Sequence, residues 1–409
     1  MEYKRKKWKS VLIVVIILIV TNTLTFIAAN FISYKLPNGK VLVSRNTYSN
    51  ILTFEKLFNI KDKLDAYYLN DYDVNKLIDG AAKGMTTAVG DPYTTYMDAE
   101  EFKDFYSQTE GNYVGLGIQV GVKDDKIVVI STFKNSPAEK VGIITGDVIE
   151  VVNGTTVKGE NLDTAISMMK GEKGGEVNLT VYREDKGSFD VVAVRDEIQM
   201  VTVQSEMIDN EVGYIEVSMF DENTSENFEK AIKELKASGM KSLIVDLRGN
   251  PGGLLDQTVN MVSQFVEKGK NIVYTEDKYN NRKDYDSKGG IAEGLPLTVL
   301  IDGGSASASE IFTGAIKDYG LGTLVGTTTF GKGVVQTTFY RAVDGFEDGT
   351  ALKVTISKYF TPNGNNIHGV GIAPDVEVQF PEELKTQTYD RSTDPQFKKA
   401  LEIAKDKLK

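Results

Sequence analysis

The chain has 409 residues, of which 41% are hydrophobic and 26% are charged, and 47 Lys and Arg against 58 Asp and Glu give a net charge of −11. These values are typical of a globular protein of two or three domains, at about 150 residues per domain, and the acidic balance argues against general nucleic-acid binding. The sequence has no cysteine and one histidine, His368, which excludes cysteine nucleophiles, disulfides and two-histidine zinc motifs and leaves His368 as the one candidate for a Ser-His-Asp triad.

The N-terminal segment combines a basic stretch with an apolar one. Residues 1–10 carry four lysines and one arginine, and Val11–Ile32 supplies 22 mostly apolar residues, where a membrane-spanning helix needs about 20. We therefore predict a transmembrane signal-anchor over 11–32, with residues 1–10 in the cytoplasm and the catalytic part outside it. A cleaved signal peptide with a poor site at 27–29 is the alternative. A chain without cysteine is unusual among eukaryotic secreted domains and common among bacterial ones, so the predicted location is a bacterial cell membrane.

The next two regions differ in their hydrophobic period. In residues 46–110 apolar residues recur at helical spacing, which predicts a small helical region that is broken at Gly90-Asp91-Pro92-Tyr93. Residues 111–196 read as short strands with one amphipathic helix, Leu162–Lys170, and make a compact β-rich domain. Its predicted strands are 115–122, 126–133, 147–152, 177–183 and 190–195.

Residues 201–380 alternate between strands and helices. The expected strands are 213–217, 242–246, 297–301 and 323–325, and the expected helices are 223–238, 255–268 and 306–319. This alternation predicts an α/β domain with mainly parallel central strands. A tail over 381–409 follows, in which Asp394–Lys409 reads as an amphipathic helix.

Two loops after predicted strands offer groups for acyl chemistry. Arg248-Gly249-Asn250-Pro251-Gly252-Gly253 could turn free amide groups towards a bound oxygen, although a plain strand-to-helix turn is the simpler interpretation. Gly304–Glu310 contains three serines at a helix start, where unpaired N–H groups would stabilise an oxyanion. The equally good alternative is a capping box formed by Ser307 and Glu310.

The third loop, Gly326–Gly333, contains Lys332 between two glycines. It resembles a phosphate-binding loop, but Gly333 stands where that motif needs Ser or Thr, and residues 334–339 read as a strand rather than a helix. A lysine serves as a general base when burial lowers its pKa, and Ser-Lys pairs occur on unrelated folds. Without the other two loops, a surface lysine would be the better interpretation.

Several motifs in chain order resemble the carboxyl-terminal processing peptidases (tail-specific proteases), which are serine endopeptidases with a Ser-Lys dyad and an inserted PDZ domain. The similar stretches are 90–96, 146–149, 152–154, 246–253, 305–311, 330–336 and 369–375. The resemblance implies an α/β core of the crotonase/ClpP-like type and no cofactor or metal.

Carried over residue by residue, the resemblance places the nucleophile at Ser307, the general base at Lys332 and a lysine-orienting glutamine at Gln336. The oxyanion donors would be the N–H groups of Gly253 and Ala308. In a straight strand Lys332 and Gln336 would lie about 13 Å apart, so either Gly333 bends the chain or the glutamine acts indirectly.

The β-rich domain resembles the family's PDZ module, with Leu116, Gly117 and Ile118 as the candidate contacts to a substrate C-terminus. The resemblance also implies that this domain gates the protease and places a basic sensor at Lys170, for which a solvated surface charge is the alternative. The expected partners are proteins or peptides with apolar C-termini, the membrane through residues 11–32, and a second copy of the chain through the helical region or the tail.

Three other functions remain open from the sequence. A non-catalytic PDZ adaptor of the cell envelope would use the same peptide-binding domain, although it has no need of Ser307, Lys332 and Gln336 together. An acyl-CoA enzyme would share the crotonase-like core, but the PDZ domain and the Ser-Lys pair fit peptides better. A serine hydrolase that uses His368 is the third, and a structural or surface role for His368 is the preferred interpretation.

Overall fold

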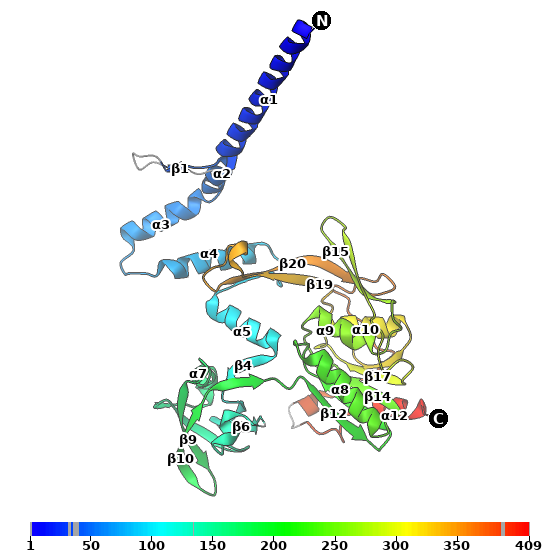
Figure 1. Cartoon of the computed structure of the whole chain (residues 1–409). Coiled ribbons are helices and arrows are strands. Elements are labelled where there is room, and N and C mark those ends of the chain that lie inside the picture. The colour runs from blue at the N-terminus through cyan, green and yellow to red at the C-terminus, as the bar shows by residue number, and fades with distance from the viewer. Residues whose placement is uncertain (1, 32–33, 36–40, 134, 386–388, 409) are drawn as a thin grey trace. The chain divides into compact units, whose positions relative to one another are not determined.

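The computed structural model describes residues 2–31, 34–35, 41–133, 135–385 and 389–408. The chain divides into two compact units, Met1–Ile78 and Asp79–Lys409 (Figure 1). The helix α4 runs across the boundary between them, and each unit is described separately below.

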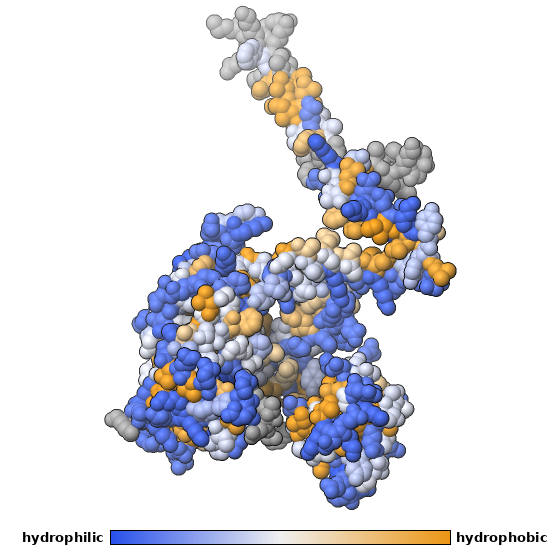
Figure 2. Space-filling model, turned by 180° about the vertical axis from the view of Figure 1, so that it is seen from behind, coloured by the Kyte–Doolittle hydropathy of each residue, from blue (hydrophilic) through white to orange (hydrophobic). Residues whose placement is uncertain are grey.

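The first unit is helical. Its elements are α1 (Glu2–Phe31), β1 (Tyr34–Lys35), β2 (Val41–Leu42), α2 (Arg45–Thr53), α3 (Glu55–Tyr67) and the first part of α4 (Val74–Ala88). The helix α2 begins after Ser44, whose hydroxyl oxygen accepts the Thr47 N–H at 3.1 Å, as expected of an N-cap. Large apolar side chains of α2 and α3 are exposed, among them Leu52, Leu57 and Phe58, and Figure 2 shows apolar residues gathered on these helices.

In the part of the chain that the structure describes, no helix is both long enough and apolar enough to cross a membrane. This finding contradicts the predicted transmembrane helix over 11–32, of which residue 32 lies outside the described residues. The uninterrupted apolar run of α1 ends at Val20, well short of the roughly 20 residues that a span requires. Polar residues follow it, and the side chains of Thr21 and Thr23 bond to carbonyl oxygens one turn earlier in the helix.

The second unit begins with the rest of α4, and the strand β3 (Thr95–Met97) and the helix α5 (Ala99–Glu110) then lead into the β-rich domain. The strands of its main sheet are ordered β10-β9-β7-β6-β5, with β8 paired to β7, and the helix α7 (Leu162–Met169) packs against it. Ile127, Ile149 and Val181 are fully buried in this domain's own core. The remaining elements are β4 (Asn112–Gly115), β5 (Ile118–Lys123), β6 (Lys126–Thr132), α6 (Pro137–Lys140), β7 (Val148–Val152), β8 (Thr155–Thr156), η1 (Gly159–Asn161), β9 (Glu176–Arg183), β10 (Gly187–Val194) and β11 (Asp196–Gln199).

The α/β core contains a six-stranded sheet in the order β12-β13-β14-β17-β18-β21. The strands from β13 to β21 are parallel, and β12 is antiparallel to β13. The sheet strands are β12 (Val203–Ile208), β13 (Val212–Val217), β14 (Ser242–Asp246), β17 (Leu297–Ile301), β18 (Gly322–Gly326) and β21 (Val376–Glu377), and the helices are α8 (Thr224–Ala237), α9 (Leu255–Ser263), α10 (Ala308–Asp318), α11 (Glu382–Lys385) and α12 (Pro395–Asp406). The mixed α/β core with an inserted β-rich domain agrees with the sequence-based expectation.

Helices cover both faces of this sheet. Phe228, Phe265 and Phe312 from the α8–α10 side meet edge to face and pack on one set of strand residues. The opposite set, which includes Ile244 and Leu300, packs against α12. Successive side chains of a strand point to opposite faces, so these buried strands are apolar throughout.

A second sheet has the order β16-β15-β20-β19, with β3 paired to β20. Its strands are β15 (Asn271–Asp277), β16 (Arg282–Asp286), β19 (Val334–Phe339) and β20 (Ala351–Phe360), with the short helix η2 (Ala342–Asp344) between the last two. This sheet places the strand that follows Lys332 beside β20, and β20 beside the segment that follows Tyr93.

Candidate active site

Three loops meet at one edge of the parallel sheet. They follow β14, β17 and β18, which are neighbours in the sheet. The carboxyl ends of parallel strands lie at the same edge, where ligands of α/β proteins bind. The Arg248–Gly253 loop, the Ser307 loop and the Lys332 loop are therefore brought together.

Ser307 stands in a strained backbone conformation directly before α10, with φ 54° and ψ −109°. A serine with positive φ at a strand-to-helix turn is typical of nucleophiles whose hydroxyl must stand clear of its own chain, and such strain costs about 1–3 kcal/mol. Tyr359 holds this conformation from one side, because its hydroxyl donates to the Ser307 carbonyl oxygen at 3.1 Å. Burial raises the pKa of Tyr359 well above its usual value, so its hydroxyl keeps the proton that it donates.

Two backbone N–H groups beside Ser307 are available to an oxyanion. Ala308 is the first residue of α10, and its N–H donates to no other described residue. Gly253 is held in place by the bonds of its two neighbours, because Phe220 N donates to Gly252 O at 3.0 Å and Leu254 N donates to Phe220 O at 2.8 Å. The N–H of Gly253 itself has no acceptor among the described residues.

Gly252 allows the two segments to approach closely. A Cβ at this position would lie 2.9 Å from the Ser307 Cβ and 3.0 Å from the Ala308 nitrogen, and φ is 107°. A side chain at residue 252 would therefore push the glycine loop away from the helix start.

Glu310 connects the Ser307 loop to the Lys332 loop. Its carboxylate accepts the N–H groups of Ser307 and Lys332, each at 2.8 Å, and the side chain is fully buried. The backbone N–H of Glu310 donates to the Ser307 carbonyl oxygen at 2.9 Å, so the start of the helix does not depend on the Ser307 hydroxyl. Only the Glu310 half of the predicted capping box is thus formed among the described residues, and the Ser307 hydroxyl stays free to act as a nucleophile.

Lys332 is a half-buried cation whose ammonium lies over the ring of Tyr93, 4.8 Å from its centroid. Burial lowers the pKa of Lys332, and the charge of Lys353 lowers it further, against the opposing effect of the Asp91 and Glu310 carboxylates. A lowered pKa increases the neutral fraction that a general base requires. In the described chain no hydrogen bond joins the ammonium of Lys332 to Ser307.

Tyr93 reaches Lys332 because the turn before β3 is held in place. Asp91 accepts the Tyr93 N–H at 3.1 Å and the Thr94 hydroxyl at 2.6 Å, and the Thr94 oxygen accepts the Thr355 N–H of β20 at 3.1 Å. Sequence reasoning included this motif in the family resemblance but assigned Tyr93 no role.

Arg248 is a second cation at the same edge, and it is fully paired. It bonds Asp246 at 2.6 Å, Asp394 at 2.7 Å and Gln396 at 3.0 Å. Burial alone would lower the pKa of Arg248, but the two carboxylates outweigh it and raise the pKa above its usual value. The contact with Asp394, the N-cap of α12, ties the C-terminal tail to the glycine loop, and sequence reasoning missed it.

Gln336 and His368 take positions that the sequence left open. The amide of Gln336 donates to the Thr355 hydroxyl at 3.4 Å, and the strand pairing is irregular between Val335 and Gln336. The bond therefore joins Gln336 to β20 rather than to Lys332. His368 is exposed and meets the edge of Tyr93 with ring centroids 6.2 Å apart, and its imidazole bonds to no described residue.

The β-rich domain has an apolar groove along β5 and α7, with a volume of about 320 Å³. The predicted contact residues Leu116, Gly117 and Ile118 line this groove. The carbonyl oxygen of Leu116 accepts the Ala138 N–H and that of Gly117 accepts the Phe133 N–H, each at 2.9 Å. The N–H groups of Leu116 and Gly117 donate to no described residue and are free for a carboxylate. The groove is lined by Ile118, Val120, Ile166 and Met169, and its rim carries Lys170 and residues of α5.

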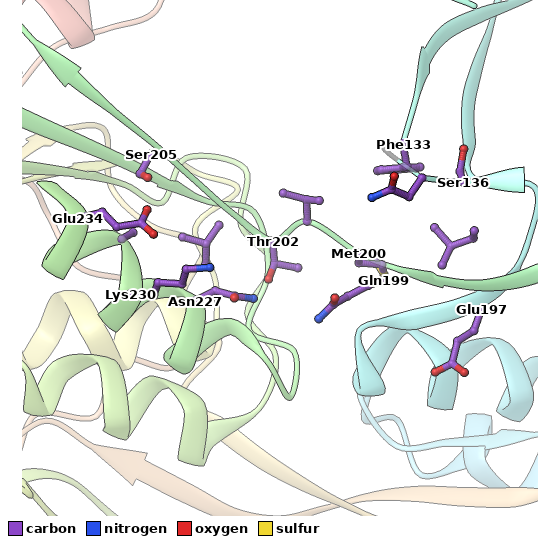
Figure 3. A pocket seen from close by; sticks show the side chains of 15 residues that line it. Phe133, Ser136, Glu197, Gln199, Met200, Thr202, Ser205, Asn227, Lys230 and Glu234 are labelled. Atoms are coloured by element: carbon purple, nitrogen blue, oxygen red, sulfur yellow. The ribbon is translucent and has the colours of Figure 1, made fainter. Parts of the chain in front are cut away.

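Lys170 forms a 3.4 Å ion pair with Asp104 of α5 at this rim. A further hollow of about 510 Å³, along the connecting segment 197–203 and α8, is lined by polar side chains such as Gln199, Asn227 and Lys230 (Figure 3). It holds none of the residues of the three loops, so it is not the candidate active site. Within the described ranges no group of three or more His, Cys, Asp or Glu is arranged to hold a metal ion.

The family models that match the chain describe the same three parts. The model of peptidase family S41 matches residues 211–378, that of the PDZ domain residues 114–191, and that of the activating protease CtpB N-terminal domain residues 18–101.

Two relatives and one solved structure illustrate the similarity. The carboxy-terminal processing protease CtpA of Bacillus subtilis (strain 168) is 37% identical over 386 residues, which cover 94% of this chain and 80% of the relative. The Probable CtpA-like serine protease of Staphylococcus aureus (strain COL) is 37% identical over 378 residues, covering 92% of this chain and 73% of the relative. A crystal structure assigned as an S41 protease from Bacteroides fragilis NCTC 9343 has a TM-score of 0.54 at 15% identity and covers 84% of this chain and 93% of its own, which shows the fold alone.

Proposed function

Since this chain belongs to the carboxy-terminal processing serine proteases of peptidase family S41, we propose that it cleaves protein substrates by acyl transfer from Ser307 with Lys332 as the general base. The observation that carries the proposal is the position of Ser307, strained at the start of α10 beside two N–H groups without acceptors. These groups, on Ala308 and Gly253, fit an oxyanion hole.

The reaction follows from these groups. Neutral Lys332 accepts the Ser307 proton while the hydroxyl oxygen attacks the substrate carbonyl, and the oxyanion is stabilised by the two N–H groups. The amine then leaves with the proton from Lys332, and an acyl-enzyme remains. Water gives its proton to Lys332 and attacks the ester, which releases the new carboxylate and restores Ser307.

Productive alignment requires the Lys332 side chain to turn from Tyr93 to Ser307. The ammonium lies over the Tyr93 ring, so the structure corresponds to a resting arrangement in this proposal. Docking of a substrate C-terminus in the PDZ groove is the event that we connect with this turn. The free N–H groups of Leu116 and Gly117 suit the terminal carboxylate, and the apolar lining of Ile118, Ile166 and Met169 suits an apolar last residue.

The deciding experiment compares the full chain with Ser307→Ala, Lys332→Ala and His368→Ala on casein. We expect the first two variants to lose turnover by at least about 10³-fold and His368→Ala to keep it, because removing either member of a dyad disables the unit. Cleavage that survived in both Ser307→Ala and Lys332→Ala would refute the proposal.

Peptides that end in an apolar residue, with a free or an amidated C-terminus, test the PDZ groove. Stimulation by the free carboxylate alone supports gating by the groove. Binding of such peptides by a wild-type chain without any turnover would instead support the adaptor function.

The proposal places the catalytic part outside the cytoplasm. The basic segment 4–9 followed by an apolar run is typical of export signals. A phosphatase that is active only after export, fused at the C-terminus, would report this location. An inactive but intact fusion would contradict it.

The exposed apolar side chains of α2 and α3 support the predicted homodimer. Sedimentation of the purified chain would test it, since a single species of 45.1 kDa would contradict self-association.

A further inference from the structure

Glu310 makes more hydrogen bonds than the start of a helix requires. One carboxylate oxygen accepts Ser307 N and Lys332 N, each at 2.8 Å, and the other accepts Gly331 N at 2.8 Å and the Thr329 hydroxyl at 2.6 Å. The side chain is 0% exposed, so no water replaces these partners. A buried carboxylate with four donors is a fixed junction between two chain segments.

The capping box at the start of α5 shows what a cap alone needs. At α5 the Glu101 carboxylate accepts the Asp98 N–H at 2.9 Å, and its other bond goes to an exposed lysine. Glu310 makes the corresponding bond to Ser307 and has three further bonds, all with the loop 329–332. The additional bonds therefore serve the lysine loop and not the helix.

The shared oxygen determines where the two reacting residues stand. Two N–H groups that donate to one oxygen at 2.8 Å must lie close together, so the main chain of Lys332 is held beside that of Ser307. The Tyr359 hydroxyl donates to the Ser307 carbonyl oxygen, and the Glu310 carboxylate accepts the Ser307 N–H. Both backbone groups of the strained residue are therefore held by hydrogen bonds. The Lys332 side chain can then turn about a main chain that these hydrogen bonds hold in place.

We infer that Glu310 is a positioning residue for the Ser307–Lys332 pair, one that holds the main chains of nucleophile and base at a fixed separation through a single carboxylate oxygen. The inference rests on the proposed Ser-Lys function. It goes beyond a helix cap because it requires Glu310 to act on Lys332 as well as on Ser307.

The test compares Glu310→Ala and Glu310→Gln in the full chain, with Glu101→Ala as the matched capping-box control. We expect Glu310→Ala to lower kcat by about 10²-fold or more with KM changed less than about threefold, since misplaced catalytic groups affect the chemical step rather than binding. Labelling of Ser307 by a fluorophosphonate should slow in parallel, whereas binding of a C-terminal peptide by the PDZ groove should not change. Glu101→Ala should keep the wild-type kcat.

Glu310→Gln provides a graded rescue. Its amide oxygen can stay between Ser307 and Lys332 while its NH₂ group turns to the Thr329 hydroxyl, so the loss is confined to the Gly331 bond. We expect a kcat between those of Glu310→Ala and wild type, about tenfold below the latter. The double variant Glu310→Ala with Lys332→Ala should be no less active than Lys332→Ala alone, because the two residues act as one unit.

Two results would overturn the inference. One is a folded Glu310→Ala with wild-type kcat and labelling rate. The other is a loss of kcat that matches the unfolded fraction measured by circular dichroism at the assay temperature, which would make Glu310 merely structural. If Glu310→Ala does not fold, a folded Glu310→Gln with wild-type kcat would overturn it in the same way.

If the proposed Ser-Lys function is itself wrong, the activities of the wild type and of Lys332→Ala show it. A wild-type chain without turnover, or Lys332→Ala with wild-type turnover, contradicts the Ser-Lys dyad itself. With an active wild type and an inactive Lys332→Ala, the Glu310 variants report on the positioning role alone.

Discussion

The loop 248–253 and the loop 326–333 lie at the same edge of the sheet, and each carries one cation. The two cations differ in whether carboxylates are bonded to them. Arg248 is 12% exposed and bonds two carboxylates, Asp246 and Asp394. Lys332 has no carboxylate bonded to its ammonium among the described residues and lies over the ring of Tyr93, near a second lysine, Lys353. The pKa of Arg248 is raised and that of Lys332 is lowered.

The difference shows that one edge of the sheet can carry both a cation that stabilises the fold, Arg248, and a cation suited to act as a base, Lys332. A paired guanidinium never gives up its proton and fixes the loop that carries Gly253. A buried ammonium without a bonded anion loses its proton more readily and becomes available as a base. The predictions below test this contrast, beginning with the largest expected effect.

Lys332→Ala should abolish turnover, by at least about 10³-fold, without lowering thermal stability at neutral pH. The folded state disfavours the protonated lysine, so the unfolded chain binds more protons between the lowered pKa and about 10.4. Wild-type stability should therefore rise with pH across that window, and the rise should be smaller in Lys332→Ala.

Lys332→Arg, which keeps the charge and cannot act as a base, serves as the control and should also be inactive. Calorimetry at several pH values combined with the casein assay measures both effects, and a marked loss of stability in Lys332→Ala would contradict the contrast.

Arg248→Met should destabilise the protein by about 3–5 kcal/mol, because Asp246 and Asp394 would remain buried without their partner. Urea unfolding measures the change. Lys405→Ala is the matched control, since it breaks an exposed α12 pair with Asp209 that is worth about 0–1 kcal/mol. Equal effects of the two substitutions would show that Arg248 is not a structural cation.

Gln336→Ala should lower kcat by less than about tenfold, because the amide bonds Thr355 and a single neutral hydrogen bond contributes about 0.5–1.5 kcal/mol. Steady-state kinetics beside Lys332→Ala measures the ratio. A loss as large as that of Lys332→Ala would mean that Gln336 reaches the lysine directly in the working enzyme.

Lys353→Met should move the rising limb of the pH profile of kcat/KM to higher pH. The charge of Lys353 lowers the pKa of Lys332, so its removal lets that pKa rise and reduces the neutral fraction at a given pH. The loss near pH 8 should be a few-fold, below the tenfold of one pH unit. Lys358→Met on the same strand is the control, and equal shifts in both variants would refute a specific effect of Lys353.

Local patterns in the sequence determined a large part of the fold. The parallel strands β13, β14, β17 and β18 and the helix α10 follow the predicted ranges closely, because a strand buried on both faces is a continuous apolar run. The strands β15, β16 and β20 were not predicted, although residues 352–357 of β20 alternate between apolar and polar side chains as a half-buried strand does. The helix α9 ends at Ser263 rather than at Lys268, since the apolar run continues past the end of the helix into a turn.

The candidate site divides in the same way. Ser307, Lys332, Gly253 and Ala308 were nominated from motifs that are short and contiguous, and their roles remain predictions. The sequence alone did not indicate the bonds of Glu310 to the lysine loop, the ring of Tyr93 against Lys332 or the contact of Arg248 with Asp394. Local sequence fixes propensity, caps and turns, because these depend on neighbours along the chain. Burial and charge pairing depend on residues that are distant in sequence, so the tertiary structure alone decided which cation is paired and which has a lowered pKa.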